Sequence, residues 1–82
     1  MTREEVLEMI RAHLADELDL DPAKVTPATR FREDLAADSL DLYTLVQELD
    51  DTYGVKMTDE EAAGIDTVEA AIDFVLTHAA DR

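Results

Sequence analysis

Residues 33–53 read EDLAADSLDLYTLVQELDDTY, and this stretch decides the fold because it joins an irregular polar segment to a strongly periodic apolar run. The apolar residues recur at spacings of three and four, which places them on one face of a helix. They are Leu42, Leu45, Val46, Leu49 and Tyr53. Asp38 and Ser39 stand where the run begins, and short oxygen-bearing side chains are typical of helix N-caps. We therefore expect a helix over residues 39–53, with the Ser39 hydroxyl at its start facing solvent or a partner.

Two more long helices are expected, one near each end of the chain. Thr2 and Glu5 fit a capping box, in which each side chain bonds the backbone of the other residue. Asp66 or Thr67 is placed to begin the last helix. Both helices have apolar residues at spacings of three and four: Val6, Ile10, Leu14 and Leu18 in the first, and Val68, Ala71, Ile72, Val75 and Leu76 in the last.

The connections between these helices differ in length. Residues 19–37 contain two prolines and lack helical periodicity over most of their length, so we expect a long loop there. Part of it resembles a calcium loop, but it has Lys24 where the turn needs glycine and Arg30 where a bidentate acid is required. We therefore expect no metal site. After the second long helix, Thr58 and Glu61 form a second capping box and predict a very short helix.

These patterns predict an all-α fold with one domain over residues 1–82. The expected architecture is a small four-helix bundle, with three main helices plus one short helix and the long loop between helices one and two. Three inward-facing apolar stripes bury one another by helix-on-helix packing. A chain of this size buries roughly 60–65% of the surface that its unfolded form exposes, which is enough for a modest core.

The charge of the chain narrows the classes of partner. Seven basic residues stand against 21 acidic ones, so the formal net charge is −14. Such a surface repels nucleic acids and anionic membranes and attracts basic patches on other proteins. No apolar run approaches the ~20 residues that span a bilayer. We expect a cytoplasmic monomer with no nucleic-acid partner and no membrane insertion.

The string EDLAADSLD, which contains Ser39, resembles the modification site of acyl carrier proteins, where Asp-Ser-Leu carries the serine that receives 4′-phosphopantetheine. The strings VTPATRFREDL and Tyr-Gly-Val-x-Met also resemble this family, so the resemblance spans nearly the whole chain. It implies a four-helix architecture. It also implies that Ser39 is the attachment residue, with Asp38 and Leu40 as its neighbours in the motif. Because the chain has no cysteine, the sulfur of any thioester must come from this attached cofactor.

The resemblance implies a carrier of acyl thioesters rather than an enzyme. A phosphopantetheinyl transferase would load the chain, and fatty-acid synthesis enzymes with basic docking patches would bind it in turn. The acidic residues that surround the serine are the candidates for docking: Glu33, Asp34, Asp41, Glu48, Asp50 and Asp51. Leu40 is either an exposed apolar contact at the centre of this face or a core residue.

An acyl cargo could also be sheltered between the helices if the core opens. The candidate walls of such a cavity are Phe31, Val46, Leu49, Ile65, Ile72 and Val75, each of which is also an ordinary core residue.

The chain departs from the common family pattern at three positions, with Ala36 in place of glycine, Thr44 in place of glutamate and Gln47 in place of an apolar residue. These departures leave the cargo open, and polyketide, D-alanyl or aminoacyl carriers are alternatives. In a different class, the chain would be an acidic protein-interaction module in which Ser39 only caps a helix.

Overall fold

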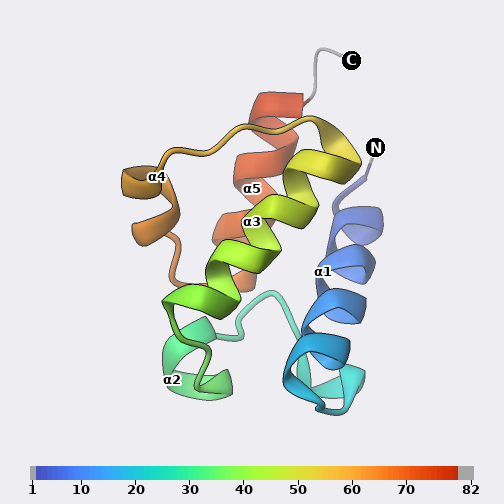
Figure 1. Ribbon diagram of the computed structural model, residues 1–82. Helices are drawn as coiled ribbons and strands as arrows, with labels where there is room; N and C mark the ends of the chain where they lie inside the picture. The colour runs from blue at the N-terminus through green and yellow to red at the C-terminus, as the bar shows by residue number, and fades with distance from the viewer. Residues whose placement is uncertain (1, 80–82) are drawn as a thin grey trace.

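The computed structural model describes residues 2–79, and every regular element in this range is helical. Three long helices pack against one another in pairs, and the two short α-helices lie outside this trio (Figure 1). The elements in chain order are α1 (Arg3–Leu18), the 3-10 helix η1 (Pro22–Lys24), α2 (Phe31–Leu35), α3 (Ser39–Tyr53), α4 (Asp59–Ala63) and α5 (Val68–Ala79).

The small helical bundle predicted from the sequence is confirmed, with one difference. The connection over residues 19–37 is not a plain loop, because it contains η1 and the five-residue helix α2. The Asp21 side chain accepts a hydrogen bond from the Ala23 N–H at 2.9 Å and caps η1, and Pro22 occupies its first turn. Helices of three and five residues are too short to repeat an apolar spacing, so the periodicity of the sequence did not reveal them.

The predicted helix starts are confirmed in detail. Both halves of the capping box between Thr2 and Glu5 are present, and so are both halves of the box between Thr58 and Glu61. At the start of α5, the Thr67 hydroxyl accepts a hydrogen bond from the Ala70 N–H at 3.1 Å. Each bond satisfies an N–H group of a first turn that has no partner within its helix.

The core lies where the apolar stripes of α1, α3 and α5 meet. The side chains of this core are at most 9% exposed, and the connection before α3 adds Val25 and Phe31 to it. The largest fully buried side chains from the long helices are Val6, Ile10, Leu14, Leu49, Val68, Ile72 and Val75. Burial of these groups is the main source of stability in a domain without disulfides.

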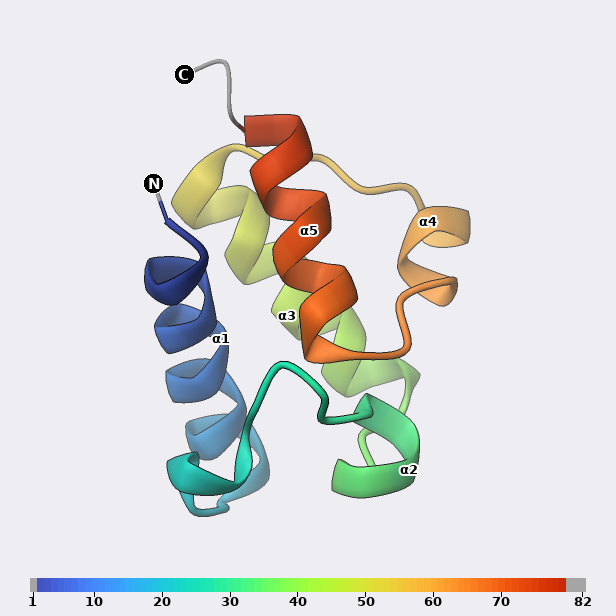
Figure 2. The same cartoon turned by 180° about the vertical axis from the view of Figure 1, so that it is seen from behind.

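Backbone hydrogen bonds fix the end of the long connection against the start of α5. The Phe31 N–H donates to the Asp66 carbonyl at 2.9 Å, and the Val68 N–H donates to the Thr29 carbonyl at 3.0 Å. Seen from behind, the connection passes beneath the first turn of α5 on its way to α2 (Figure 2). Helix α2, and the turn that leads from it into Ser39, are thereby anchored to the core.

Within the described residues, three that end helices have left-handed backbone conformations, and the first is Asp19, which follows α1 with φ 53° and ψ 53°. Ala36 follows α2 with φ 56° and ψ 29°, and Gly54 follows α3 with φ 68° and ψ 26°. An L-residue with a side chain pays roughly 1–2 kcal/mol in this region, whereas glycine adopts it freely. Ala36, which has a side chain, is therefore strained.

We expect Ala36→Gly to raise the free energy of unfolding by about 0.5–1 kcal/mol, because the relief of strain exceeds the roughly 0.4–1 kcal/mol that the added freedom of the unfolded chain costs. Gly54→Ala is the matched control. A Cβ at Gly54 would meet no atom within 4 Å, so the substitution acts only through the left-handed backbone conformation. The free energy of unfolding should therefore fall by about as much as Ala36→Gly raises it. Urea unfolding measures both variants. Equal destabilisation by both substitutions would contradict the assignment of strain to Ala36.

Candidate functional site

Ser39 is the first residue of α3, and its hydroxyl is free. The N-cap is Asp38, whose carboxylate accepts the Asp41 N–H at 3.0 Å, while the Asp41 carboxylate accepts the Asp38 N–H at 3.2 Å. Ser39 is exposed, and within residues 2–79 no hydrogen bond involves its hydroxyl. The hypothesis that Ser39 serves only as the helix cap is therefore wrong, since the neighbouring aspartate performs that task. Ser39 is also the only serine in the chain.

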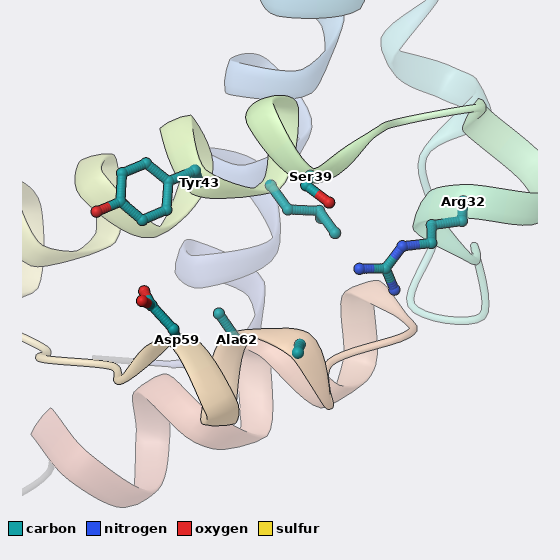
Figure 3. Close-up of a pocket in the computed structure, with 7 residues that line it drawn as sticks. Arg32, Ser39, Tyr43, Asp59 and Ala62 are labelled. Atoms are coloured by element: carbon teal, nitrogen blue, oxygen red, sulfur yellow. The ribbon is translucent and has the colours of Figure 1, made fainter.

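A hollow of about 390 Å³ lies beside Ser39, between α3 and α4, and we call it the Ser39 hollow. Its lining comes from α2, α3 and α4, three elements that are separate in sequence (Figure 3). The lining residues are Arg32, Ser39, Leu42, Tyr43, Asp59, Ala62 and Ala63. Of these, sequence reasoning assigned a functional role to Ser39 alone.

The positively charged and the negatively charged side chain of the Ser39 hollow lie at opposite ends of it. The Ser39 hydroxyl and the Arg32 guanidinium point toward one another at one end, and the Tyr43 hydroxyl and the Asp59 carboxylate lie at the other (Figure 3). The position of Tyr43 near Ser39 could have been predicted from the sequence, because Tyr43 is one helical turn beyond Ser39. Asp59 could not, because its position depends on how α4 folds back against α3.

Leu40 projects into solvent, which decides between its two predicted roles. It is 71% exposed, and Tyr43, three residues later on the same face of α3, is 59% exposed. They are the large apolar side chains that the described chain exposes most. Exposed apolar groups beside a free hydroxyl are typical of an interaction site.

The acidic residues predicted for docking are not equally available. Glu33 and Asp34 both form ion pairs with Arg30, at 3.2 and 3.4 Å. Asp50 pairs with Lys56 at 2.9 Å.

The other three predicted acids are in different situations. Asp41 is engaged in the capping box of α3, and Glu48 accepts a hydrogen bond from the Thr52 hydroxyl at 3.2 Å. Asp51 is exposed, and no ion pair involves it within residues 2–79. Since exposed ion pairs are weak, a partner can compete for the paired acids, but it must displace a cation at three of the six.

Hydrogen bonds from the backbone and the side chain of Arg30 lower the pKa of the Asp34 carboxyl. The main cause is the hydrogen bond from the Arg30 backbone N–H at 2.9 Å, and the Arg30 guanidinium adds to it. A carboxyl whose pKa is lower in the folded chain stabilises the fold above its unfolded pKa, and this stability is lost as the pH falls through the folded pKa.

We expect an NMR titration to place the Asp34 pKa below 3.8, the ordinary value for the residue. In Arg30→Gln the pKa should rise only part of the way toward that value, because the backbone hydrogen bond remains. An unchanged pKa in this variant would show that the guanidinium has no influence on Asp34.

The predicted cargo cavity is closed in this structure. A void of only about 10 Å³, which is close to the space of one water molecule, lies inside the bundle. Four of the six predicted wall residues line it, namely Phe31, Val46, Leu49 and Ile65, whereas Ile72 and Val75 are buried elsewhere in the core. A chain of methylenes would enter only if the helices moved apart.

Residues 2–79 contain neither a metal-binding cluster nor a membrane-spanning helix. No group of three or more histidine, cysteine, aspartate or glutamate side chains is arranged to hold a metal ion. Within the same range, no helix has the length and apolar character needed to cross a bilayer.

Comparison with known proteins gives a consistent result. A family model described as "Phosphopantetheine attachment site" matches residues 8–75. The acyl carrier protein of Rubrobacter xylanophilus is 51% identical over 78 residues, which cover 95% of this chain and 96% of that protein. That of Thermosynechococcus vestitus is 45% identical over 75 residues, which cover 92% and 93% of the two chains. The solved acyl carrier protein from Enterococcus faecalis has a TM-score of 0.80 and 37% identity, and the match covers 95% of this chain and 99% of that one.

Proposed function

Because the chain belongs to the acyl carrier family, whose members carry phosphopantetheine, we propose that Ser39 is the residue to which the arm is attached. The observation that carries this proposal is the free, exposed hydroxyl of Ser39 at the start of α3, next to an aspartate that already caps the helix. The Arg32 guanidinium, at the same end of the Ser39 hollow as the Ser39 hydroxyl, fits a phosphodiester at this position (Figure 3). No other serine competes for the modification.

Loading would be catalysed by a separate phosphopantetheinyl transferase with coenzyme A as the donor. A bond forms between Ser39 Oγ and the phosphorus of the pantetheine phosphate, and the P–O bond within the pyrophosphate of coenzyme A breaks. Adenosine 3′,5′-bisphosphate leaves with the electron pair of that bond, and the serine proton passes to a base on the transferase or to water. The arm supplies the thiol on which acyl groups are held as thioesters.

The chain is thus a carrier of acyl thioesters, and we propose fatty-acid synthesis as the pathway it serves. The support is its identity of 45–51% to proteins named acyl carrier protein, over more than 90% of the chain, together with the acidic surface around Ser39. Basic patches on successive enzymes would dock there in fast, salt-sensitive encounters that release easily. We further propose that the carrier acts as a cytoplasmic monomer.

The exposed face of α3 also fits enzymes that load cargo other than fatty acyl groups. Thr44 and Gln47 lie one and two turns from Leu40, so the centre of this face is uncharged and the acids flank it. A partner must therefore accept the apolar Leu40 and Tyr43 as well as the negative charge. Enzymes that handle polyketide, D-alanyl or aminoacyl cargo could supply such a surface.

The pathway can be tested by offering the loaded chain to purified enzymes. With acetyl coenzyme A as the primer, malonyl coenzyme A, NADPH and the malonyl transferase, condensing, reducing and dehydrating enzymes of a dissociated fatty-acid synthase, the acyl group on the thiol should grow by two carbons per cycle, and each condensation releases one CO₂. D-alanyl, aminoacyl and polyketide loading enzymes serve as the comparison. Efficient loading by one of these, with no extension by the fatty-acid enzymes, would overturn fatty-acid synthesis and retain the carrier.

A further inference from the structure

Arg32 is the only basic residue among those that line the Ser39 hollow, and its charge is poorly matched within the described chain. Its one ion pair joins it to Asp66 at 3.9 Å, with side chains that are 45% and 80% exposed. An exposed pair at this separation contributes little to stability. The neighbouring Arg30 differs, since it is engaged by two carboxylates and does not line the hollow.

We propose that Arg32 is a positioning residue, which binds the phosphodiester on Ser39 and thereby lays the first part of the arm in the Ser39 hollow. This inference rests on the proposed attachment at Ser39. A phosphodiester keeps one negative charge at neutral pH, and the planar guanidinium of arginine can donate two parallel hydrogen bonds to its oxygens. Because the Ser39 hydroxyl and the guanidinium already point toward one another, attachment places the phosphate on the side of its cation (Figure 3).

The charge at the far end of the Ser39 hollow fixes the direction of the arm. The Asp59 carboxylate repels a phosphate there and can accept hydrogen bonds from the amide N–H groups that follow along pantetheine. Leu42, Ala62 and Ala63 provide the apolar lining of the hollow, and Ala62 lies between its two ends (Figure 3). Alanines leave room for the two methyl groups next to the phosphate. Phosphate, methyl groups and amides would then lie in the order in which the hollow presents a cation, an apolar wall and an acceptor.

Such binding would hold the arm weakly against the protein between encounters. Arg32 is exposed, so water and salt weaken its attraction for the phosphate, and a docking enzyme can draw the arm out. The group that binds Arg32 is a phosphate ester, and we assign it to the arm attached to Ser39 of the same chain. Free phosphate gains nothing from attachment and should bind far more weakly.

The test compares the phosphopantetheinylated chain with the same form of Arg32→Gln, and uses Arg30→Gln as the control with an equal loss of charge. In the wild type we expect nuclear Overhauser contacts between the methyl groups of the arm and those of Ala62 or Ala63. We also expect a ³¹P resonance shifted from that of free phosphopantetheine. Both signals should be lost in Arg32→Gln and kept in Arg30→Gln. At about 1 M salt, where the Debye length is ~3 Å, the wild-type ³¹P shift should approach that of Arg32→Gln.

Two results would overturn the inference. One is a ³¹P shift and methyl contacts that are the same in the wild type and Arg32→Gln. The other is a signal lost equally in both arginine variants, which would reflect net charge alone. Thermal unfolding of both variants checks that the fold is kept, and titration of the unmodified chain with inorganic phosphate reports binding that does not need the arm. Intact mass is recorded first, so that failure to load, which would contradict the proposed attachment itself, is distinguished from failure to position the arm.

Discussion

Ser39→Ala is expected to abolish loading with phosphopantetheine, so that the intact mass after incubation with coenzyme A and an active transferase equals the mass before it. The reason is chemical, because the substitution removes the hydroxyl oxygen that forms the bond to phosphorus. Ser39 does not cap α3, its hydroxyl makes no hydrogen bond within the described residues, and it is exposed. The free energy of unfolding should therefore change by no more than about 0.5 kcal/mol.

Thr44→Ala is the matched control for this experiment. It removes another hydroxyl from α3, but that hydroxyl donates a hydrogen bond to the Leu40 carbonyl at 2.9 Å and is therefore not free to act as a nucleophile. We expect Thr44→Ala to load as completely as the wild type. Loading of Ser39→Ala to the same extent would place the arm on another residue and contradict the proposal.

Phe31→Ala is expected to cause a large loss of stability, about 3–5 kcal/mol. Phe31 is fully buried at the start of α2, and its side chain lines the internal void together with residues of α3 and α5. Removal of the ring would enlarge that void, and the surrounding helices can close it only in part. Against a total stability of roughly 5–15 kcal/mol for natural domains, this loss would leave the fold marginal.

Tyr43→Ala provides the comparison, since it removes an aromatic ring that is 59% exposed. Its cost should be within about 0.5 kcal/mol. Urea unfolding at one temperature measures both variants. A cost below about 1 kcal/mol for Phe31→Ala would show that the ring does not anchor α2, and that the position of Ser39 depends on other contacts.

The three long helices and the place of Ser39 could be predicted from the sequence, because each long helix has several turns in which apolar residues recur and a cap residue at its start. Helix α2 could not, since five residues allow only one turn, and Phe31 was predicted as a cavity or core residue but not as the start of a helix. Its burial depends on hydrogen bonds between the long connection and residues 66–68, which are far apart in the sequence.

The sequence predicts the sign of the charges around Ser39 but not which of these charges form ion pairs. The sequence shows which residues are acidic, whereas the pairing of Arg30 with Asp34 and of Lys56 with Asp50 depends on side-chain geometry. The Ser39 hollow is a tertiary feature in the same way, because Arg32 and Asp59 reach it from different helices. The exposure of Leu40 also follows from the rotation of α3 against the core, which the short motif around the serine does not reveal.

The central claim, that this chain carries acyl groups on an arm attached to Ser39, is tested most directly by fragmentation mass spectrometry of the loaded wild-type protein. The chain is incubated with coenzyme A and transferase, then given an acyl group, and cleaved into peptides. The account predicts one phosphopantetheinyl group, on the peptide that contains Ser39, with an acyl group that hydroxylamine releases. No mass increment, with a transferase that loads another carrier in the same reaction, would contradict the account.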